Sequence, residues 1–345
     1  MFNSISIRPE YVIGIAILVL VGAGLFFLPP RNTVKSVQGS PYQEIRNPSG
    51  FVNTDGITIS ELVGTKVILV DFMTYSCINC QRTFPYLNDW YARYKDQGLE
   101  IIGIHTPEFA FEHDLDNVRA AMQKFGITYP VILDNEYATW AAYKNRYWPR
   151  KYLIDIHGNI VYDHIGEGAY AETENKIVEQ LNERKRVLGE SGVVTVSGSE
   201  PLDMQPVVFD KIGTPETYLG AERLQYLVNL PAVSCLSGSC SYQFMSDEPR
   251  GYELSGEWKI DGEYAKLETP GGAIRITFSA AKVNLVMGAP RDVRASVYVD
   301  GVLHRQVTVR AHDLYSLVEL PEYGTHVMEI RFDDADVSVF AFTFG

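Results

Sequence analysis

The sequence predicts an apolar N-terminal helix, then an α/β domain with a central mixed sheet and flanking helices, and then an all-β sandwich. Three observations predict this order. Residues 11–28 carry no charge, apolar strands alternate with helical patterns between residues 66 and 188, and short alternating segments follow from about residue 250. The chain has 345 residues, of which 46% are hydrophobic, so two domains with sizeable cores are expected.

The N-terminal segment 11–28 reads YVIGIAILVLVGAGLFFL, which approaches the roughly 20 apolar residues that span a bilayer. A cleaved signal peptide is the alternative, but its apolar core is usually shorter and ends at small residues. We therefore expect a tail at residues 1–10, a single-pass transmembrane helix at 11–28 and a tether at 29–49. Basic residues flank the helix on both sides, so they leave its orientation open.

The α/β domain is expected at residues 50–190. Strands are predicted at 66–73, 100–105 and 130–134, a hairpin at 151–164 around a Gly-Asn turn, and helices at 78–97 with Pro85 as a kink, at 112–125, up to about 145, and at 171–188. Residues 191–205 contain Gly and Ser and are expected to be a linker.

The all-β domain is expected at residues 206–345. Its strands are predicted at 273–278, 283–287, 293–299, 306–309, 326–332 and 337–344. The net charge of −13 argues against a general nucleic-acid binder, which needs a basic face to neutralise phosphates.

Cys77 and Cys80 follow a buried strand and open a helix. The free N–H groups and the positive dipole end of a helix start stabilise a thiolate, and such sites lower the pKa of a cysteine thiol from about 8.5 to between about 3.5 and 7.5. Cys77 is therefore predicted to be the exposed nucleophile and Cys80 the shielded resolving thiol. A structural or metal-binding pair is the alternative, but the strand-then-helix context favours redox chemistry. We expect no metal and no cofactor beyond a redox-active Cys77–Cys80 disulfide.

The run Val70-Asp71-Phe72, Cys77-Ile78-Asn79-Cys80 and Pro85 resembles the active-site segment of the thioredoxin-like superfamily, specifically its extracytoplasmic TlpA-like branch. The string TYSCINC at residues 74–80 resembles the C-terminal portion of DipZ-type proteins. The resemblance implies a thioredoxin fold, followed by a β-sandwich similar to carbohydrate-binding modules. The chain departs from these proteins because a single anchor stands where they carry a larger membrane domain for electron transfer.

Two carboxylates acquire roles through this resemblance. Asp71 matches the buried carboxylate of thioredoxins, and it would accept the proton of the resolving thiol. The alternative is an aspartate at a strand end that is satisfied by backbone N–H groups. Glu108 resembles an active-site glutamate of part of the TlpA-like branch and would tune the same thiols; the alternative is an ordinary loop carboxylate.

Pro149 matches the proline that faces the cysteines in this superfamily with a cis peptide bond, although most X–Pro bonds are trans. The backbone of Trp148 would then pair with a substrate strand. The family often has threonine before this proline, so Trp148 is a departure. Together with Arg150 it is expected to alter the thiolate or to select acidic partners.

Cys235 and Cys240 flank a small loop that permits closure of a disulfide. We expect a structural disulfide, with a second redox pair as the alternative, because no helix start is evident there.

The favoured function is a thiol–disulfide oxidoreductase that reduces, or alternatively oxidises, cysteines of exported proteins. Close cysteine pairs suit an oxidising compartment, so the body is expected on the extracytoplasmic, periplasmic side of a bacterial-type cytoplasmic membrane. The resemblance implies a membrane electron donor of the CcdA or DsbD type and a carbohydrate or cell-wall ligand for the β domain. Two alternatives remain: a thiol peroxidase on the same fold, and a non-catalytic cell-wall or carbohydrate-binding protein.

Overall fold

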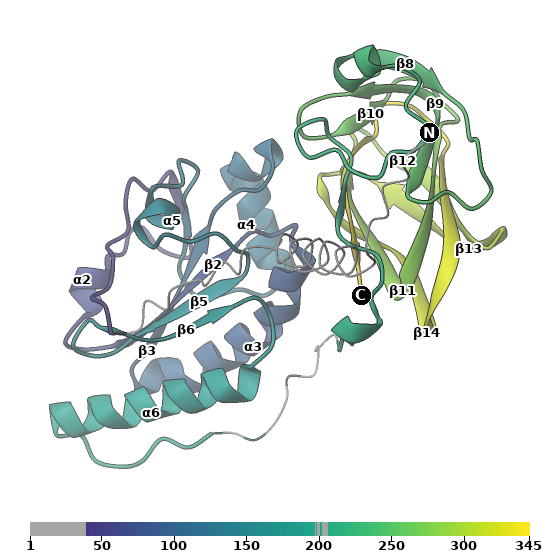
Figure 1. The fold of residues 1–345 in the computed structure, drawn as a ribbon. Coiled ribbons are helices and arrows are strands. Elements are labelled where there is room, and N and C mark those ends of the chain that lie inside the picture. Colours follow the sequence, from purple (N-terminus) through teal and green to yellow (C-terminus); the bar gives the residue numbers. More distant parts are fainter. Residues whose placement is uncertain (1–38, 197, 199–200, 202–205) are drawn as a thin grey trace, which may run out of the picture. The chain divides into compact units, whose positions relative to one another are not determined.

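The computed structural model describes residues 39–196, 198, 201 and 206–345 (Figure 1). The predicted tail at 1–10 and the predicted transmembrane helix at 11–28 lie outside the described residues. Within the described residues, no helix combines the length and the apolar character that crossing a membrane requires.

The α/β domain contains a mixed sheet of six strands within the described part of the chain, in the order β1-β4-β3-β2-β5-β6. Strands β2, β3 and β4 are parallel to one another, and β1, β5 and β6 pair antiparallel with their neighbours. The strands are β1 (Gly50–Val52), β2 (Val67–Met73), β3 (Leu99–His105), β4 (Val131–Leu133), β5 (Arg150–Ile154) and β6 (Ile160–Ile165). The predicted mixed sheet, including the hairpin, is confirmed.

Helices cover both faces of this sheet (Figure 1). The apolar residues of α3, α4 and α6 pack in one cluster with Leu69 and Met73 of β2. Phe72 points to the opposite face of β2, where it packs against the rings of Trp140 and Tyr143 at α5. The helices are α2 (Ile59–Leu62), α3 (Ile78–Tyr94), α4 (Leu115–Lys124), α5 (Ala138–Ala142) and α6 (Tyr170–Leu188), with the 3₁₀ turns η1 (Lys95–Gln97) and η2 (Ala110–His113).

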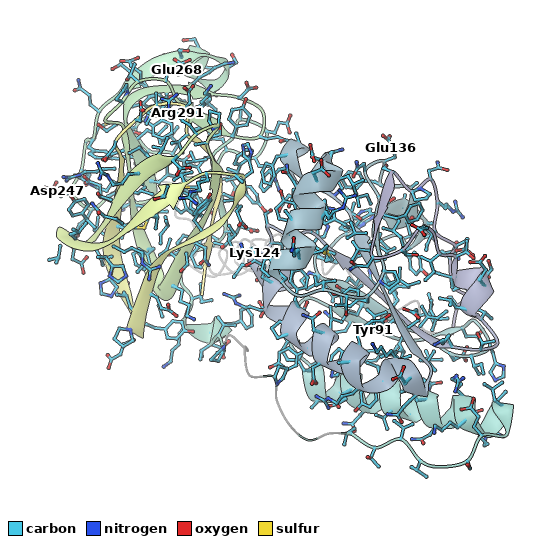
Figure 2. The ribbon with its side chains drawn as sticks, turned by 180° about the vertical axis from the view of Figure 1, so that it is seen from behind. Tyr91, Lys124, Glu136, Asp247, Glu268 and Arg291 are labelled. Carbon is cyan, nitrogen blue, oxygen red and sulfur yellow. A yellow bond between two sulfur atoms is a disulfide. The ribbon has the colours of Figure 1, made fainter. Side chains whose placement is uncertain are left out.

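Helix α3 begins at the predicted redox motif, with Cys77 as its N-cap, and Pro85 lies inside it as expected. Tyr91 of α3 extends from the helix (Figure 2), and its hydroxyl donates to the Glu100 carboxylate on β3 at 3.1 Å. The Tyr91 ring also meets Tyr129 edge-on, with centroids 5.8 Å apart. These contacts hold the C-terminal part of helix α3 against the sheet.

The α/β domain extends beyond the predicted boundaries at both ends. Residues 39–42 belong to the expected tether, yet the amide of Tyr42 donates to the Gly158 carbonyl at 2.9 Å, in the turn of the hairpin. Val194 belongs to the expected linker, yet it is buried and the Asn182 side chain binds both its N–H and its carbonyl. Both segments are held by hydrogen bonds to distant parts of the domain: the first by backbone groups of the hairpin and the second by the Asn182 side chain.

The β domain forms one hydrogen-bonded sheet of nine strands among the described residues, in the order β13-β12-β14-β11-β15-β10-β9-β8, with β7 paired to β15. Strand β11 also pairs with β9, so part of the sheet closes on itself around the core. The strands are β7 (Thr217–Tyr218), β8 (Ser239–Tyr242), β9 (Tyr252–Ile260), β10 (Ala265–Leu267), β11 (Ala273–Gly288), β12 (Val293–Val299), β13 (Val302–Val309), β14 (Asp313–Phe332) and β15 (Ser338–Phe344). Two 3₁₀ turns, η3 (Phe209–Lys211) and η4 (Val233–Ser237), precede β8.

The all-β prediction is confirmed, but its division into short strands of two separate sheets is not. The predicted strands 273–278 and 283–287 are parts of the single strand β11, and residues 313–325 join the predicted strand 326–332 in β14. Shifts in the β11–β14 register at Ala280–Asn284 account for the difference. Such irregularities bend a strand without ending it, so one long strand can serve both sides of a core.

Cys235 and Cys240 are joined by a disulfide that links η4 to β8. The predicted pairing is therefore confirmed. Cys77 and Cys80 are free thiols in this structure.

Candidate active site

Cys77 caps the N-terminus of helix α3. Its backbone is extended, and its sulfur accepts the N–H of Cys80 at 3.4 Å, in the way that a serine or aspartate oxygen accepts at other helix starts. The chain enters this position directly from the buried strand β2, through the three residues Thr74, Tyr75 and Ser76. Cys77 is half-buried, whereas Cys80 is fully buried. The predicted division into an accessible and a shielded thiol therefore has a structural basis.

The loop before Cys77 is held from two sides. The Gln81 side chain donates to the Tyr75 carbonyl at 2.8 Å. On the other side, the hydroxyl and the amide of Ser76 both donate to Oε1 of Glu112, at 2.7 and 3.2 Å. The backbone that leads into Cys77 is thus fixed by its own helix and by the η2 segment.

Asp71 and Lys151 form a buried ion pair below the thiols. Asp71 follows the alternation of Leu69 and Met73, so it faces the helix α3 side of the sheet. Lys151 lies directly opposite Asp71 in the antiparallel β2–β5 pair, which places both side chains on the same face. The Lys151 Nζ atom is 3.4 Å from Oδ1 of Asp71, and both side chains are almost completely buried.

The electrostatics of this buried group favour protonated acids. Burial raises the pKa of the Cys80 thiol well above its usual range, and the neighbouring Cys77 sulfur acts in the same direction. Burial also raises the pKa of the Asp71 carboxyl, while the Lys151 ammonium partly opposes that shift. A carboxyl with a raised pKa beside a buried thiol is suited to accept the proton of that thiol and to return it.

The Trp148–Pro149 peptide bond is cis, as the resemblance implied. The indole N–H of Trp148 donates to the Thr106 carbonyl at 3.0 Å, and its ring lies 4.3 Å from that of Trp140. Trp148 is therefore anchored to the loop after β3 while its edge stays partly accessible.

Comparison of the sequence with known proteins shows which families its two domains resemble. The Redoxin family model matches residues 38–181, and the model described as thioredoxin like C-terminal domain matches residues 214–345. Protein DipZ of Mycobacterium tuberculosis is 34% identical over 307 residues, which cover 88% of this chain. An alignment of that length includes both domains.

The chain contains a thioredoxin-like domain of the Redoxin family.

Smaller relatives match the thioredoxin-like domain alone. The thiol-disulfide oxidoreductase ResA of Halalkalibacterium halodurans is 33% identical over 32% of this chain and 60% of that protein. The thiol-disulfide oxidoreductase YkuV of Bacillus subtilis is 26% identical over 41% of this chain and 95% of that protein. The chain spans only 42% of the length of the DipZ protein that it resembles.

Glu108 of the thioredoxin-like domain contacts the β domain. Residues 38–345 form one compact unit, and within it Oε1 of Glu108 accepts the Tyr218 hydroxyl at 3.0 Å and the Arg223 guanidinium at 2.7 Å. The sequence analysis expected Glu108 to tune the thiols directly. The structure instead brings Glu112, one helical turn further on, to the residue before Cys77, because both residues lie on the same short loop and only Glu112 turns inward.

Arg150 was expected to meet acidic partners, but the structure places it inside the thioredoxin-like domain. Its guanidinium pairs with Asp163 at 2.6 Å and lies over the Tyr152 ring, and its side chain is 2% exposed. A charge that is this buried and already paired is not available to a docking protein. Trp148 thus remains the one expected substrate-contacting side chain that is partly exposed.

Lys151 and Glu112 are the site residues that the sequence analysis missed. Lys151 could have been recognised because it is a charged residue two positions after Pro149, at the start of a predicted strand. Flanking helices were expected to cover the sheet to which that strand belongs. Glu112 could have been recognised because it follows the apolar residues Phe109 and Phe111. A carboxylate in an apolar segment is rarely buried unless it is paired.

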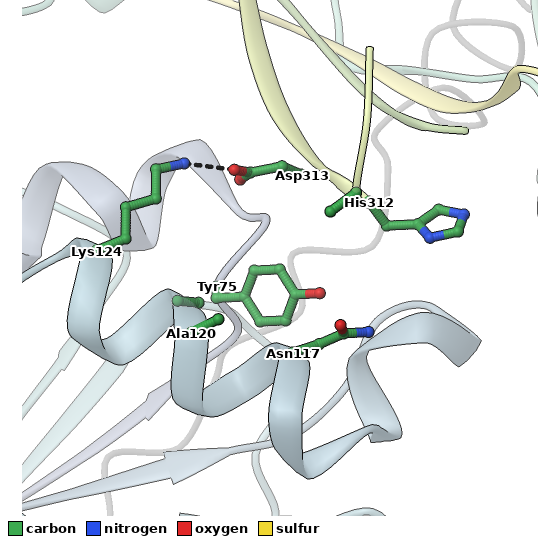
Figure 3. A pocket seen from close by; sticks show the side chains of 8 residues that line it. Tyr75, Asn117, Ala120, Lys124, His312 and Asp313 are labelled. Carbon is green, nitrogen blue, oxygen red and sulfur yellow. Dashed lines mark hydrogen bonds and ion pairs between the residues drawn. The ribbon is translucent and has the colours of Figure 1, made fainter. Parts of the chain in front are cut away.

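A small cavity lies at Tyr75, two residues before Cys77 in the sequence (Figure 3). It has a volume of about 110 Å³ and is lined by Tyr75, by residues of α4 and by residues 311–313. At one end the Lys124 ammonium pairs with Asp313 at 2.5 Å. The Tyr75 hydroxyl has no hydrogen-bond partner among the described residues, so it is the polar atom left over for a solvent molecule. In the described ranges, no three acidic, histidine or cysteine side chains gather in a way that would hold a metal ion.

Proposed function

We propose that the chain is a thiol–disulfide oxidoreductase that reduces disulfides of exported proteins. The observation that carries this proposal is the asymmetric thiol pair: a partly accessible Cys77 at a helix start and a buried Cys80 above the Asp71–Lys151 pair. The thioredoxin-like domain and the relatives named thiol-disulfide oxidoreductase support it. The vicinal thiols favour disulfide exchange over peroxide reduction, because the resolving thiol already lies beside the nucleophile.

The proposed reaction transfers two electrons to the substrate. The Cys77 thiolate attacks one sulfur of the substrate disulfide, which forms a mixed disulfide and releases the other sulfur as a thiolate. Cys80 then gives its proton to Asp71 and attacks the Cys77 sulfur. This step breaks the mixed disulfide, releases the second substrate thiolate and leaves a Cys77–Cys80 disulfide. A further two-electron reductant must then restore the two thiols.

The direct test is insulin reduction by the purified full-length chain with dithiothreitol as the reductant. We expect turnover above the rate of dithiothreitol alone, and we expect Cys77→Ser to abolish the added rate because the nucleophile is gone. The double variant Cys235→Ala/Cys240→Ala is the matched control, and it should keep the rate. Equal rates for Cys77→Ser and the unmodified chain would reject the proposal.

Membrane attachment and compartment belong to the same proposal. The apolar segment 11–28 supports a single-pass anchor in a bacterial-type cytoplasmic membrane, with both domains on the extracytoplasmic side. The Cys235–Cys240 disulfide supports an oxidising compartment. Fractionation of cells and protease treatment of intact spheroplasts would test this: degradation of both domains from outside is expected, and protection of both would contradict it.

The proposed electron donor is a membrane protein of the CcdA or DsbD type. The resemblance to DipZ-type proteins and the apolar segment 11–28 support a reducing supply across the membrane. Trapping of a mixed disulfide between the Cys80→Ser variant and a membrane protein would support this partner. A pair that is fully oxidised in growing cells would contradict it.

We also propose a carbohydrate or cell-wall ligand for the β domain. Trp258, an aromatic residue that could have stacked on a sugar ring, is buried in the core and is not available. A second cavity of about 150 Å³ is better suited, because it is lined by the exposed Tyr226 together with Arg250 and threonine hydroxyls. Binding of cellohexaose or chitohexaose that Tyr226→Ala removes would support this ligand class, and no binding of either would count against it.

A further inference from the structure

Glu112 is a completely buried carboxylate that neither the proton-transfer step nor the ion pairs of the site use. It lies in the 3₁₀ turn η2, among aromatic side chains. A buried carboxylate is costly unless hydrogen bonds replace its lost hydration. Hydrogen bonds from the Thr74 side chain and from four further donors do so here, and those four divide between its two oxygens.

One carboxylate oxygen of Glu112 accepts hydrogen bonds from the start of the η2 segment itself. Oε2 accepts the backbone N–H groups of Glu108 and Phe109, at 2.6 and 3.1 Å. This is the arrangement by which a glutamate closes the start of its own helical turn. A purely local capping role would end with these two bonds.

The other carboxylate oxygen accepts hydrogen bonds from a segment 36 residues away in the sequence. Oε1 accepts both the hydroxyl and the amide of Ser76, the residue before Cys77. Two donors from one residue that converge on one carboxylate oxygen fix the orientation of that residue as well as its distance. Glu112 therefore joins the η2 segment to the backbone that delivers Cys77 to the helix start.

The far side of this link is also fixed. Glu108, whose amide donates to Glu112, is held through its own carboxylate by Arg223 and Tyr218 of the β domain. The adjacent Phe109 packs against Phe340 of the β domain, with centroids 5.1 Å apart. The segment that Glu112 ties to the thiol site is thus braced from the C-terminal half of the molecule.

We propose that Glu112 is a positioning residue of the thiol site: its carboxylate, acting through Ser76, sets the backbone that holds Cys77 in its capping position. The inference rests on the proposed disulfide-exchange function. Glu112 touches no reacting sulfur, so its effect is on the geometry of attack, where a displacement of about 1 Å costs on the order of 100-fold in rate.

The experiment separates geometry from charge with two variants of the full-length chain. Glu112→Asp keeps the charge but is one methylene too short to reach both segments. Glu112→Gln keeps the length, and its one carbonyl oxygen can still accept from Ser76, but its NH2 group then faces the N–H groups of Glu108 and Phe109, so the charge and those two bonds are lost. Glu100→Asp is the matched control, because Glu100 is a partly buried carboxylate of the same domain that pairs with Tyr91 in the last turn of α3, at the end opposite Cys77. The readouts are kcat and KM for insulin reduction, and the rate at which iodoacetamide alkylates Cys77.

We expect Glu112→Asp to lower kcat by about 100-fold and to slow alkylation of Cys77, with Glu112→Gln closer to the unmodified chain. Ser76→Ala should lower kcat by about tenfold, because it removes one of the two bonds to Oε1. The double variant Ser76→Ala/Glu112→Asp should be no slower than Glu112→Asp alone, since both changes break the same link.

Several results would overturn the inference: Glu112→Asp as active as Glu100→Asp, a slower Glu112→Gln than Glu112→Asp, or multiplying effects in the double variant. If Glu112→Asp fails to fold by circular dichroism, Ser76→Ala decides alone, and an unchanged rate rejects the link. Failure of the proposed function is distinguishable, because an unmodified chain that does not reduce insulin still reports the position of Cys77 through its alkylation rate.

Discussion

The pairing of Asp71 with Lys151 sets the proton chemistry of the thiol site. Both groups are almost fully buried, and the two carboxylate oxygens and the ammonium have no conventional hydrogen-bond partner among the described residues besides this ion pair. The cost of burying a carboxylate is therefore offset mainly by one charge. Whatever changes that charge must change the pH at which Asp71 gives up its proton.

Lys151→Met tests this directly. Because Lys151 lowers the pKa of Asp71, its loss should raise that pKa further, so the unprotonated base becomes available only at higher pH. We expect the pH dependence of the Cys80 attack to move to higher pH. Release of a fluorescent thiol from a preformed Cys77 mixed disulfide, followed from pH 5 to 10, measures this step.

The matched control for that variant is Lys95→Met, an exposed lysine in η1. It should leave the profile unchanged. A profile of Lys151→Met that coincides with that of Lys95→Met would remove Lys151 from the proton-transfer step.

His105 gives the thioredoxin-like domain an acid sensitivity. It is fully buried on β3 against the Tyr75 ring, and burial lowers its pKa to about 3. The unfolded chain binds a proton at this residue near pH 6.5, while the folded domain does not. Stability from this residue is therefore present above pH 6.5 and is lost as the pH falls toward 3.

At pH 4.5 the expected loss is about 3 kcal/mol relative to pH 7. His105→Gln should flatten the dependence of the unfolding free energy on pH, whereas His113→Gln, at an exposed site in η2, should not. Urea unfolding followed by tryptophan fluorescence at the two pH values checks both variants. An equal slope for His105→Gln and the unmodified chain would contradict the expectation.

Local sequence patterns predicted the two reactive cysteines. The residues that surround them are brought together by pairing between segments far apart in the sequence. Cys77 and Cys80 were predictable because a strand, two cysteines and a helix follow one another along the chain. Lys151 lies 80 positions after Asp71, and only the β2–β5 register brings the two together. Glu112 faces Ser76 through the turn of η2, which no periodicity in the sequence indicates. Pro149 was found by family resemblance rather than by composition.

At the scale of elements, the alternation of side chains along strand β5 determines which of them face the thiol site. Arg150 and Lys151 are neighbours, and successive residues of a strand point to opposite faces. Lys151 therefore faces Asp71 and Arg150 faces Asp163. The expectation that Arg150 selects acidic partners is contradicted by its burial, because the exact start of this strand fixes the face of each residue. A sequence pattern does not give such a boundary to within one residue.

The long strands of the β domain were divided in the prediction for a similar reason. Ala280, Ala281 and Lys282 interrupt the alternation of apolar residues, and a break in alternation reads as a turn. In the structure the chain continues through them as an irregular part of β11 that pairs with β14. The composition indicated strands throughout this region. Only the pairing with β14 shows that the predicted strands 273–278 and 283–287 form the single strand β11.

The Cys235–Cys240 disulfide stabilises the element that it closes. It joins residues only five positions apart, so in the chain-entropy account its removal should cost about 2 kcal/mol. We expect Cys235→Ala/Cys240→Ala to lower the unfolding free energy by that amount without changing insulin reduction. Loss of insulin reduction in this variant, with the fold intact by circular dichroism, would reassign the pair to the redox chemistry.

At the scale of the whole molecule, the two domains share buried and charged contacts. Phe109 and Phe111 of the thioredoxin-like domain pack with Phe340 of the β domain, and the Glu108–Arg223 pair lies beside them. Contacts of this kind couple the unfolding of neighbouring domains, because neither can open without exposing the shared apolar surface.

Arg223→Met is expected to weaken that coupling. It leaves the Glu108 carboxylate largely buried with the Tyr218 hydroxyl as its remaining partner, and the exposure of Arg223 limits the loss to about 1 kcal/mol. Arg294→Met, which breaks an exposed ion pair with Asp333, should cost almost nothing. Calorimetry should show a lower transition temperature for the first variant alone, and equal temperatures for both would argue against a stabilising role of the Arg223 pair.

The strand order of the β domain also bears on how separate molecules behave at high concentration. The sheet ends at β8 and β13, and a terminal strand offers backbone groups on which a foreign strand can add. The Cys240 bridge pins β8, while β13 exposes Val302 and Leu303 and then follows them with His304 and Arg305. Positive charge on a terminal strand repels a like copy, so self-association would begin at β13 and would be favoured by neutralising Arg305.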